Sequence, residues 1–197
     1  NRHEYKIPGK GSSNELEAEI AADLVRIRLH DIKGSNEQEK ALHEIGVISA
    51  YKAQVKLIRQ KLSGILPEEL VREMAASLDS FQGQERDLII YSFTKSSESS
   101  PNQRRIGFLN ELRRLNVAMS RCKKGLVMIG DMQFLQNCRH MDQDEDGNDI
   151  YEQSEKQFSD FVRKMYTDVT QKNRGQRFTY QEFHKRCEEI LNHDSGE

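Results

Sequence analysis

The sequence has no tryptophan, only three cysteines and no long apolar run. A helix that crosses a bilayer needs roughly 18 or more consecutive apolar residues, so no membrane partner is expected. The cysteines, Cys122, Cys138 and Cys187, are odd in number, far apart and without a CxxC pair. This spacing argues against a disulfide framework or a zinc site and favours reduced thiols. The six histidines show no ligand spacing, so they suggest no metal site.

The beginning of the chain lacks both an initiator methionine and an apolar stretch. A secretory signal peptide is therefore not expected, and the chain is interpreted as a piece of a longer protein. We expect an intracellular location, either cytoplasmic or nucleoid-associated. The length of 197 residues fits one ordinary domain with an appended tail.

Charge is nearly balanced overall, with a net charge of −2, but it is unevenly distributed. Residues 104–124 carry five Arg and two Lys against the single acid Glu111, whereas residues 142–149 carry acids and no base. The overall balance argues against a generic nucleic-acid-binding protein. The basic stretch is either a solvated face or a binding surface, and apolar residues interleave with it at helical spacing.

Apolar periodicity predicts alternating helices and short buried strands. Four apolar runs separated by helices are typical of a mostly parallel sheet covered on both faces, which is an α/β domain. We place this domain at residues 1–131 and a helical extension at 132–197. Loops are expected at 31–40 and 95–102, with an acidic loop at 141–149. The predicted helices span 14–29, 51–62, 110–122, 132–139, 152–166 and 180–191, and the predicted strands span 45–48, 73–78, 87–93 and 126–129.

Residues 77–87 form a polar segment between two predicted strands. Ligands bind in loops at strand ends in open α/β sheets. Gly83 would let the backbone approach a phosphate or a sugar, and Gln82 and Glu85 offer an amide and a carboxylate nearby. The alternative is an ordinary solvated turn.

Residues 107–121 read as an amphipathic basic helix. Positions seven apart on a helix differ by only about 20° in heading, so Arg114 and Arg121 are expected to share one face. Leu112, Leu115 and Met119 would form the core-facing stripe. Guanidinium groups on such a face suit bidentate phosphate recognition, although a solvated basic face is equally compatible.

Residues 45–54 read as a strand that runs into a helix. Ser49 lies near the start of that helix. Its hydroxyl can cap the helix or, with the free N–H groups, hold a phosphate.

In this order the three segments resemble motifs IV, V and VI of superfamily 1 helicases, in the branch of the nonsense-mediated-decay RNA helicase. The resemblance spans residues 14–131, and three ordered motifs are far more specific than one. An Asn-x-x-Glu-Ala run that precedes motif IV in this branch is matched by Asn14, Glu17 and Ala18. The motif matches are Ile45, Gly46, Val47, Ile48, Tyr51 and Gln54; Asp79, Phe81, Gln82, Gly83, Glu85 and Asp87; and Arg113, Arg114, Leu115, Asn116, Val117, Ala118 and Arg121.

The resemblance implies a RecA-like fold, of the P-loop-NTPase type, with ATP in a cleft between this domain and a preceding RecA-like domain. It implies that Arg121 is the arginine finger that stabilises charge on the γ-phosphate, with support from Arg114. Glu85 would hydrogen-bond the ribose, with Gln82 and Gly83 at the nucleotide cleft. Contacts with single-stranded DNA or RNA are assigned to Ser49, Tyr51 and Ser77.

A phosphate loop is missing from the sequence: Gly9-Lys10-Gly11-Ser12 lacks the first glycine and the Lys-Ser adjacency. No Asp-Glu pair follows an apolar strand to hold Mg²⁺. ATP and Mg²⁺ are therefore expected as cofactors whose cradle lies in the preceding domain, and the chain alone is expected not to hydrolyse ATP. The predicted function is the C-terminal motor domain of an ATP-dependent DNA or RNA helicase. The alternative is a non-catalytic scaffold that binds nucleic acid or a partner.

Two features of the extension leave alternatives open. Residues 142–153 begin like a calcium-binding EF-hand loop but end in Gln153 where a bidentate Glu is needed. They are a solvated acidic insertion or a weak cation site. Phe158, Phe161 and Phe183 are expected in the core of the extension, with a partner-docking surface as the alternative.

Overall fold

A computed structural model describes residues 4–7, 11–30, 32, 35–81, 83–96, 112–137, 141–143, 149–151, 153–172 and 174–192. The strands are β1 (Glu4–Ile7), β2 (Gly11–Asn14), β3 (Ile45–Ser49), β4 (Ala75–Ser77), β5 (Arg86–Ser92), β6 (Cys122–Ile129), β7 (Met141–Gln143) and β8 (Asp149–Tyr151). The helices are α1 (Glu15–His30), α2 (Ser35–His43), α3 (Lys52–Leu62), α4 (Glu68–Met74), α5 (Leu112–Met119), α6 (Met132–Asn137), α7 (Gln153–Thr170) and α8 (Tyr180–Asn192).

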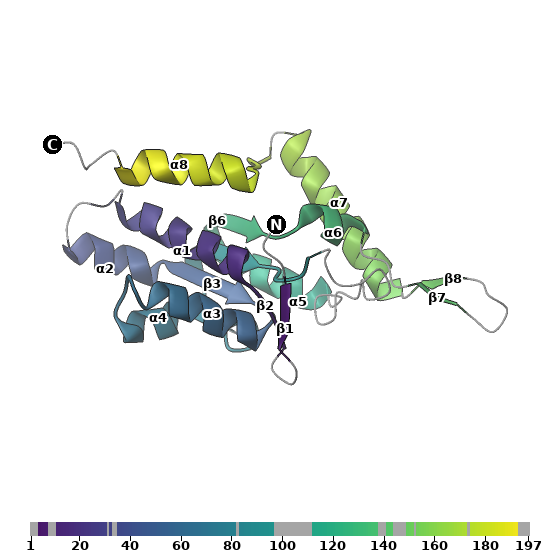
Figure 1. The fold of residues 1–197 in the computed structure, drawn as a ribbon, viewed down its shortest axis with the longest axis horizontal. Helices are drawn as coiled ribbons and strands as arrows, with labels where there is room; N and C mark the ends of the chain where they lie inside the picture. The colour runs from purple at the N-terminus through teal and green to yellow at the C-terminus, as the bar shows by residue number, and fades with distance from the viewer. Residues whose placement is uncertain are drawn as a thin grey trace.

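The central sheet consists of parallel strands in the order β4-β3-β5-β6. In its register Val47 of β3 pairs with Ala75 of β4 on one side and with Ile90 of β5 on the other. Two antiparallel hairpins, β1–β2 and β7–β8, lie outside this sheet, and the second projects from one end of the molecule (Figure 1). The predicted α/β fold with a parallel sheet is confirmed.

Helices α1 to α4 pack on one face of the sheet (Figure 1). Ile45 and Val47 of β3 belong to the core on this face, whereas Ile48 belongs to the core on the other, as the two-residue period of a strand requires. Because both faces are covered, β3 reads as a continuous apolar run. Small residues let α1 approach closely; its buried apolar residues are Ala18, Ala21, Ala22 and Val25.

Helices α5, α6 and α7 pack on the opposite face. Phe158 of α7 is fully buried, and its ring meets that of Phe93 edge-on with centroids 6.3 Å apart. Val162 is buried in the same cluster and Phe161 is partly buried against it, while Phe183 of α8 is half-buried. The expected core role of Phe158 is confirmed. Helix α7 therefore shares one hydrophobic core with the parallel sheet.

Gly46 of β3 lies directly beneath the ring of Phe81. A Cβ added at this glycine would stand 2.6 Å from Phe81 Cζ and 2.9 Å from Ile89 Cδ1. Phe81 is itself only 1% exposed. The absence of a side chain at position 46 therefore lets the segment that follows β4 pack against the sheet.

Two sequence predictions were wrong in the first half of the chain. The expected loop at 31–40 contains the start of α2, whose Glu, Gln and Lys residues favour helix although its apolar pattern is weak. The expected strand at 73–78 is shorter, because its first residues end helix α4. The hairpin of β1 and β2 was not expected.

Further corrections concern the second half. The helix expected at 110–122 ends at Met119, and Cys122 already begins β6. The acidic loop expected at 141–149 starts and finishes in the paired strands β7 and β8. Residues 144–148 and 152 of the calcium-loop-like stretch lie outside the described residues. Within the part of the chain that is described, no helix is long and apolar enough to span a membrane.

Candidate functional site

The predicted site residues lie at two opposite edges of the parallel sheet. Ser49 and Ser77 are the last residues of β3 and β4, at the carboxyl edge. Glu85 and Arg121 immediately precede β5 and β6, at the amino edge. Ligands of open α/β sheets usually bind at the carboxyl edge. The structure therefore separates the predicted residues into two groups rather than gathering them in one cluster.

Arg121 lies in the turn between α5 and β6. Its N–H donates to the carbonyl of Ala118 at 3.2 Å, and its carbonyl accepts from the N–H of Arg86 at 3.0 Å. The prediction that Arg114 and Arg121 share the face of one helix was wrong, because α5 ends at Met119. The side chain of Arg114 lies outside the described residues.

The guanidinium of Arg121 contains a buried polar atom without a partner. Its Nε is shielded from solvent and makes no hydrogen bond within the described part of the chain. Buried N–H groups nearly always donate a hydrogen bond in native proteins, and a buried donor left without an acceptor costs roughly 1–3 kcal/mol. An anionic group brought to this turn would satisfy the donor.

Gly83 and Glu85 lie in the exposed segment that leads into β5. Gly83 has φ +79°, a left-handed conformation that favours glycine, and open space lies where a Cβ would be. The Glu85 carboxylate stands 3.5 Å from Lys123 Nζ, with 54% and 55% of the two side chains exposed. Such exposed ion pairs contribute little to stability, so Glu85 is available to a ligand. Gln82 lies outside the described residues.

Ser49 and Tyr51 are buried at the carboxyl end of β3. The Ser49 hydroxyl is fully shielded, contacts Thr94 Oγ1 at 3.0 Å and accepts from the N–H of Tyr51 at 3.3 Å. The ammonium of Lys95 stands 5.3 Å from the centre of the Tyr51 ring and donates to Ser12 Oγ at 3.0 Å. These groups fix the chain where β3 ends.

Ser77 lies at the carboxyl end of β4, beside a pocket of ≈ 250 Å³. Its hydroxyl is bonded to that of Ser80 at 2.7 Å and accepts from the Ser80 N–H at 3.3 Å. Only 8% of Ser77 is exposed, whereas Ser80 is exposed. The residues that line the pocket are Lys52, Val55, Lys56, Arg59, Ser77 and Ser80.

A buried polar network behind these serines was not assigned a site role from the sequence. The Glu17 carboxylate, 4% exposed, accepts from Ser92 Oγ at 2.6 Å and from the N–H of Thr94 at 2.7 Å. Gln54 of α3 donates to Ser92 Oγ at 3.1 Å and to the carbonyl of Asn14 at 3.0 Å. The network joins α1, α3 and the carboxyl ends of β3 and β5.

The sequence did carry a signal for this network. The Asn14 side chain accepts from the N–H of Glu17 at 3.2 Å, which is the N-cap bond of α1. An Asn followed three positions later by Glu is the pattern of a capping box. Here the Glu17 side chain turns further inward, towards the end of β5, instead of completing that box.

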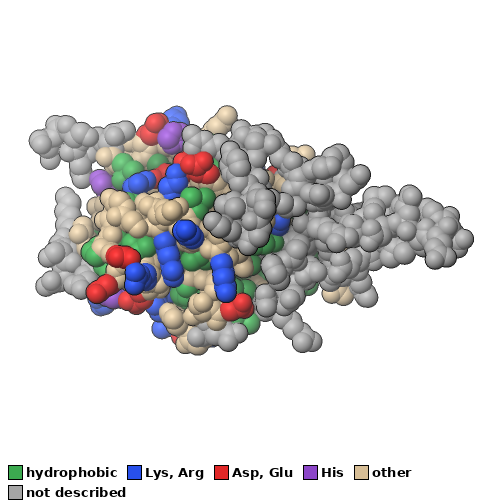
Figure 2. Space-filling view, turned by 60° about the horizontal axis from the view of Figure 1, so that its bottom comes forward, with side chains coloured by type: hydrophobic (Ala, Val, Ile, Leu, Met, Phe, Trp, Pro, Cys, Tyr) green, Lys and Arg blue, Asp and Glu red, His purple; other side chains and the backbone are tan. Residues whose placement is uncertain are grey.

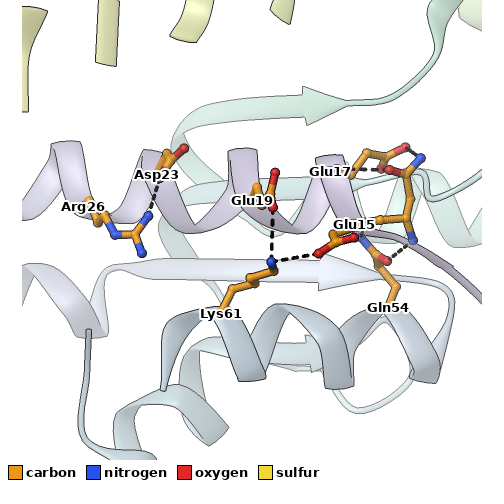
Figure 3. A network of polar contacts seen from close by, with 8 residues as sticks. Glu15, Glu17, Glu19, Asp23, Arg26, Gln54 and Lys61 are labelled. Carbon is orange, nitrogen blue, oxygen red and sulfur yellow. Dashed lines mark hydrogen bonds and ion pairs between the residues drawn. The ribbon is translucent and has the colours of Figure 1, made fainter. Parts of the chain in front are cut away.

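Lys61 of α3 forms two ion pairs with α1. Its ammonium contacts Glu15 Oε1 and Glu19 Oε1 at 3.2 Å each (Figure 3). The hydrogen bond to Glu19 is the main reason why the pKa of Lys61 is raised, while partial burial opposes the shift. No group of three or more His, Cys, Asp or Glu side chains among the described residues is arranged to hold a metal ion.

Comparison with known proteins identifies the family. Residues 1–133 match the model of the AAA domain. The chain is 38% identical over 122 residues to the DNA polymerase alpha-associated DNA helicase A of Saccharomyces cerevisiae, covering 62% of this chain and 16% of that protein. It is 37% identical over 133 residues to the regulator of nonsense transcripts 1 homolog of Drosophila melanogaster, covering 66% and 10%.

A third relative is the ATP-dependent helicase NAM7 of Saccharomyces cerevisiae, 42% identical over 95 residues that cover 47% of this chain and 9% of that protein. The chain thus spans 9% to 16% of the length of these relatives. The AAA match extends over most of the chain, including the whole parallel sheet. The chain belongs to the AAA domain family, and its RecA-like domain is that of a superfamily 1 helicase of the nonsense-mediated-decay-like branch.

Proposed function

We propose that this chain is the C-terminal motor domain of an ATP-dependent helicase that moves along single-stranded DNA or RNA. The observation that carries the proposal is the buried Nε of Arg121, which has no hydrogen-bond partner among the described residues. A buried guanidinium N–H without a partner fits a site at which an anionic ligand supplies the hydrogen-bond acceptor. The printed names of the relatives, which include ATP-dependent helicase and DNA helicase, support the same function.

The nucleotide site would be shared between two domains. In this proposal Arg121 donates to the terminal phosphate, where a positive charge stabilises the charge that develops during phosphoryl transfer. Arg114 would add a second charge from the first turn of α5, and the exposed Glu85 would accept from the ribose, beside Gln82 and Gly83. The phosphate loop and the Mg²⁺ ligands would come from a preceding RecA-like domain. Bound Mg²⁺ would neutralise phosphate charge.

The strand path would follow the carboxyl edge of the sheet, where Ser49, Tyr51 and Ser77 lie. Because the Ser49 hydroxyl and the Tyr51 ring are buried, these residues would act by fixing the backbone at the end of β3. Ser77 lies beside the pocket and would be the one of the three that contacts the strand. ATP binding would close the cleft between the domains, and hydrolysis would reopen it.

The test is the ATPase rate of the longer protein that contains this chain together with its phosphate loop. Arg121→Ala is expected to lower kcat about a thousandfold, as loss of an arginine finger does. Arg114→Ala, measured in parallel, should lower kcat less, because that residue has a supporting role. Arg26→Ala, at an exposed position of α1, is the matched control and should leave kcat unchanged. Retained turnover in Arg121→Ala would sink the finger assignment, and a greater loss in Arg114→Ala would transfer it to Arg114.

A further inference from the structure

Arg86, the first residue of β5, adjoins both residues on which the proposed nucleotide site depends. It follows Glu85 directly in the chain, and its backbone N–H donates to the carbonyl of Arg121 at 3.0 Å. Its register partner in the sheet is Cys122, the first residue of β6. The segments that carry Glu85 and Arg121 are therefore joined at Arg86.

The guanidinium of Arg86 donates hydrogen bonds to the segment that carries Glu85. Its Nη1 donates to the carbonyl of Glu85 at 3.1 Å. Its Nη2 donates to Gln84 Oε1 at 3.0 Å and to Glu73 Oε1 of α4 at 3.2 Å. Because a guanidinium is planar and its donors have fixed directions, these contacts restrict the segment strongly. The chain before β5 is thereby tied to the end of α4.

The same guanidinium also packs on a buried aromatic ring. Its Cζ lies 5.5 Å from the centre of the Phe81 ring, and the carbonyl of Phe81 accepts from the N–H of Gln84 at 3.3 Å. Only 13% of the Arg86 side chain is exposed, against 54% of that of Glu85. Neighbouring residues of an extended chain point to opposite sides. An inward anchor at Arg86 therefore directs the Glu85 carboxylate outward.

The burial of Arg86 carries a cost in stability. Its Nε is shielded from solvent and makes no hydrogen bond among the described residues. A buried donor without an acceptor is unfavourable, so stability alone would not favour an arginine at this position. A role in holding the Glu85 segment accounts for its presence.

We infer that Arg86 is a positioning residue of the nucleotide site, which holds the Glu85 carboxylate where it meets the ribose. The inference rests on the proposed function, which assigns the ribose contact to Glu85. Arg86 acts through Glu85, because its own Nη1 and Nη2 donate within the chain. The link to Arg121 is a backbone hydrogen bond, which a side-chain substitution retains. Loss of the Arg86 side chain should therefore weaken ATP binding far more than it slows phosphoryl transfer.

The test measures kcat and KM for ATP with the longer protein that contains this chain together with its phosphate loop. Arg86→Ala should raise KM about tenfold, the size expected when a hydrogen bond to a charged group is lost, and should change kcat less than about threefold. Glu85→Ala should raise KM at least as much. In the double variant Glu85→Ala/Arg86→Ala, KM should equal that of Glu85→Ala alone, because the two residues act as one unit.

A second readout reports the ribose contact itself. The analogues 2′-deoxy-ATP and 3′-deoxy-ATP each lack one hydroxyl from which the Glu85 carboxylate accepts. The unmodified protein should use at least one of them about tenfold less well than ATP, measured as kcat/KM. Arg86→Ala should reduce this preference to about twofold. A general loss of stability would leave the preference unchanged, so this readout isolates the positioning role.

Glu73 offers a second variant that reaches Arg86 from outside the site. Its Oε1 contacts both Arg86 Nη2 and His43 Nδ1, and about half of the Glu73 and His43 side chains is exposed. Glu73→Ala should lower the ribose preference in the same direction as Arg86→Ala, but less. His43→Ala removes the other partner of Glu73 and should leave the preference unchanged. Because Glu73 lies at the surface, this pair keeps the test decisive if Arg86→Ala does not fold.

Exposed charges supply the remaining controls. Figure 2 shows Lys, Arg, Asp and Glu side chains interspersed on one face of the molecule. Single exposed charges contribute little to stability. Arg26→Ala on α1 is the control for Arg86→Ala, and Glu69→Ala on α4 is the control for Glu73→Ala. Both should leave KM and the ribose preference unchanged, and circular dichroism checks that all variants are folded.

The possible failures are distinguishable. If Glu85→Ala abolishes the ribose preference and Arg86→Ala and Glu73→Ala do not, the inference is overturned while the proposed function stands. A fall in kcat without a rise in KM in Arg86→Ala would also overturn it. If the unmodified protein does not prefer ATP over either analogue and Glu85→Ala leaves KM unchanged, the ribose contact of the proposed function fails, and the inference with it.

Discussion

The carboxylate of Glu17 accepts a 2.7 Å hydrogen bond from the backbone N–H of Thr94, which lies 77 positions further along the chain. Thr94 follows β5 and has φ +71°, a conformation that side-chain-bearing residues rarely adopt. Its carbonyl accepts from Asn14 Nδ2 at 3.4 Å, and its hydroxyl contacts Ser49. The first turn of α1 thus holds the chain in a strained conformation where β5 ends.

Replacing Glu17 with Ala should destabilise the fold by roughly 2–4 kcal/mol, because it leaves the buried donors of Ser92 and Thr94 without an acceptor. Urea unfolding followed by circular dichroism measures this change. Glu19→Ala, two positions away on α1, is the control: it removes one of the two partners of Lys61 at a partly exposed site and should cost less than about 1 kcal/mol. Equal effects of the two substitutions would show that the buried network contributes no special stability.

Gly46→Ala should destabilise the domain by about 1–3 kcal/mol through overpacking. The added methyl would meet the Phe81 ring and Ile89, both of which are buried. Gly64→Ala, where nothing lies within 4 Å of the new methyl, should be neutral or slightly stabilising. Urea midpoints of the two variants are compared.

A second substitution separates this clash from other causes. Phe81→Leu removes the ring edge that meets the new methyl, so the double variant Gly46→Ala/Phe81→Leu should be more stable than the sum of the single changes predicts. Strict additivity would contradict a direct contact between these two positions.

The thiol of Cys187 should resist ionisation in the folded chain. Burial, and secondarily the charge of Asp23, raise its pKa from 9.0 to about 11. The unfolded chain releases this proton near pH 9, so the contribution to stability is complete below that pH and is lost as the pH rises to about 11. Alkylation by iodoacetamide in a Cys122→Ser/Cys138→Ser background should show a midpoint above pH 10. A midpoint near pH 9 would contradict the burial of this thiol.

Much of the sheet follows from the sequence, because β3, β5 and β6 each contain a short apolar run. Helices α2 and α4 were not predicted, because they are short and mostly polar. They are stabilised by the few residues that they bury, such as Leu42 and Met74. The end of α5 was predicted too late in the chain, because the apolar spacing continues past Met119 into the strand that begins at Cys122.

The candidate site residues were chosen by type and motif order, whereas their arrangement in space was not predictable from the sequence. Motif order singles out Glu85 and Arg121 as candidates, yet only the strand register reveals that both precede strands, away from Ser77. The network around Glu17 depends on contacts across more than seventy positions. The basic pocket joins residues of α3 to the end of β4, and no local sequence pattern records that pairing.

Strand separation by a longer protein that contains this chain and a phosphate loop tests whether the chain is part of a helicase. A labelled duplex with a single-stranded overhang is mixed with the protein and either ATP or a non-hydrolysable analogue, and displaced strand is measured over a single turnover. We expect displaced strand with ATP but not with the analogue, and loss of displacement in Arg121→Ala while overhang binding is retained. Overhang binding by the unmodified protein without ATP hydrolysis or strand displacement would overturn the helicase function and indicate a non-catalytic scaffold.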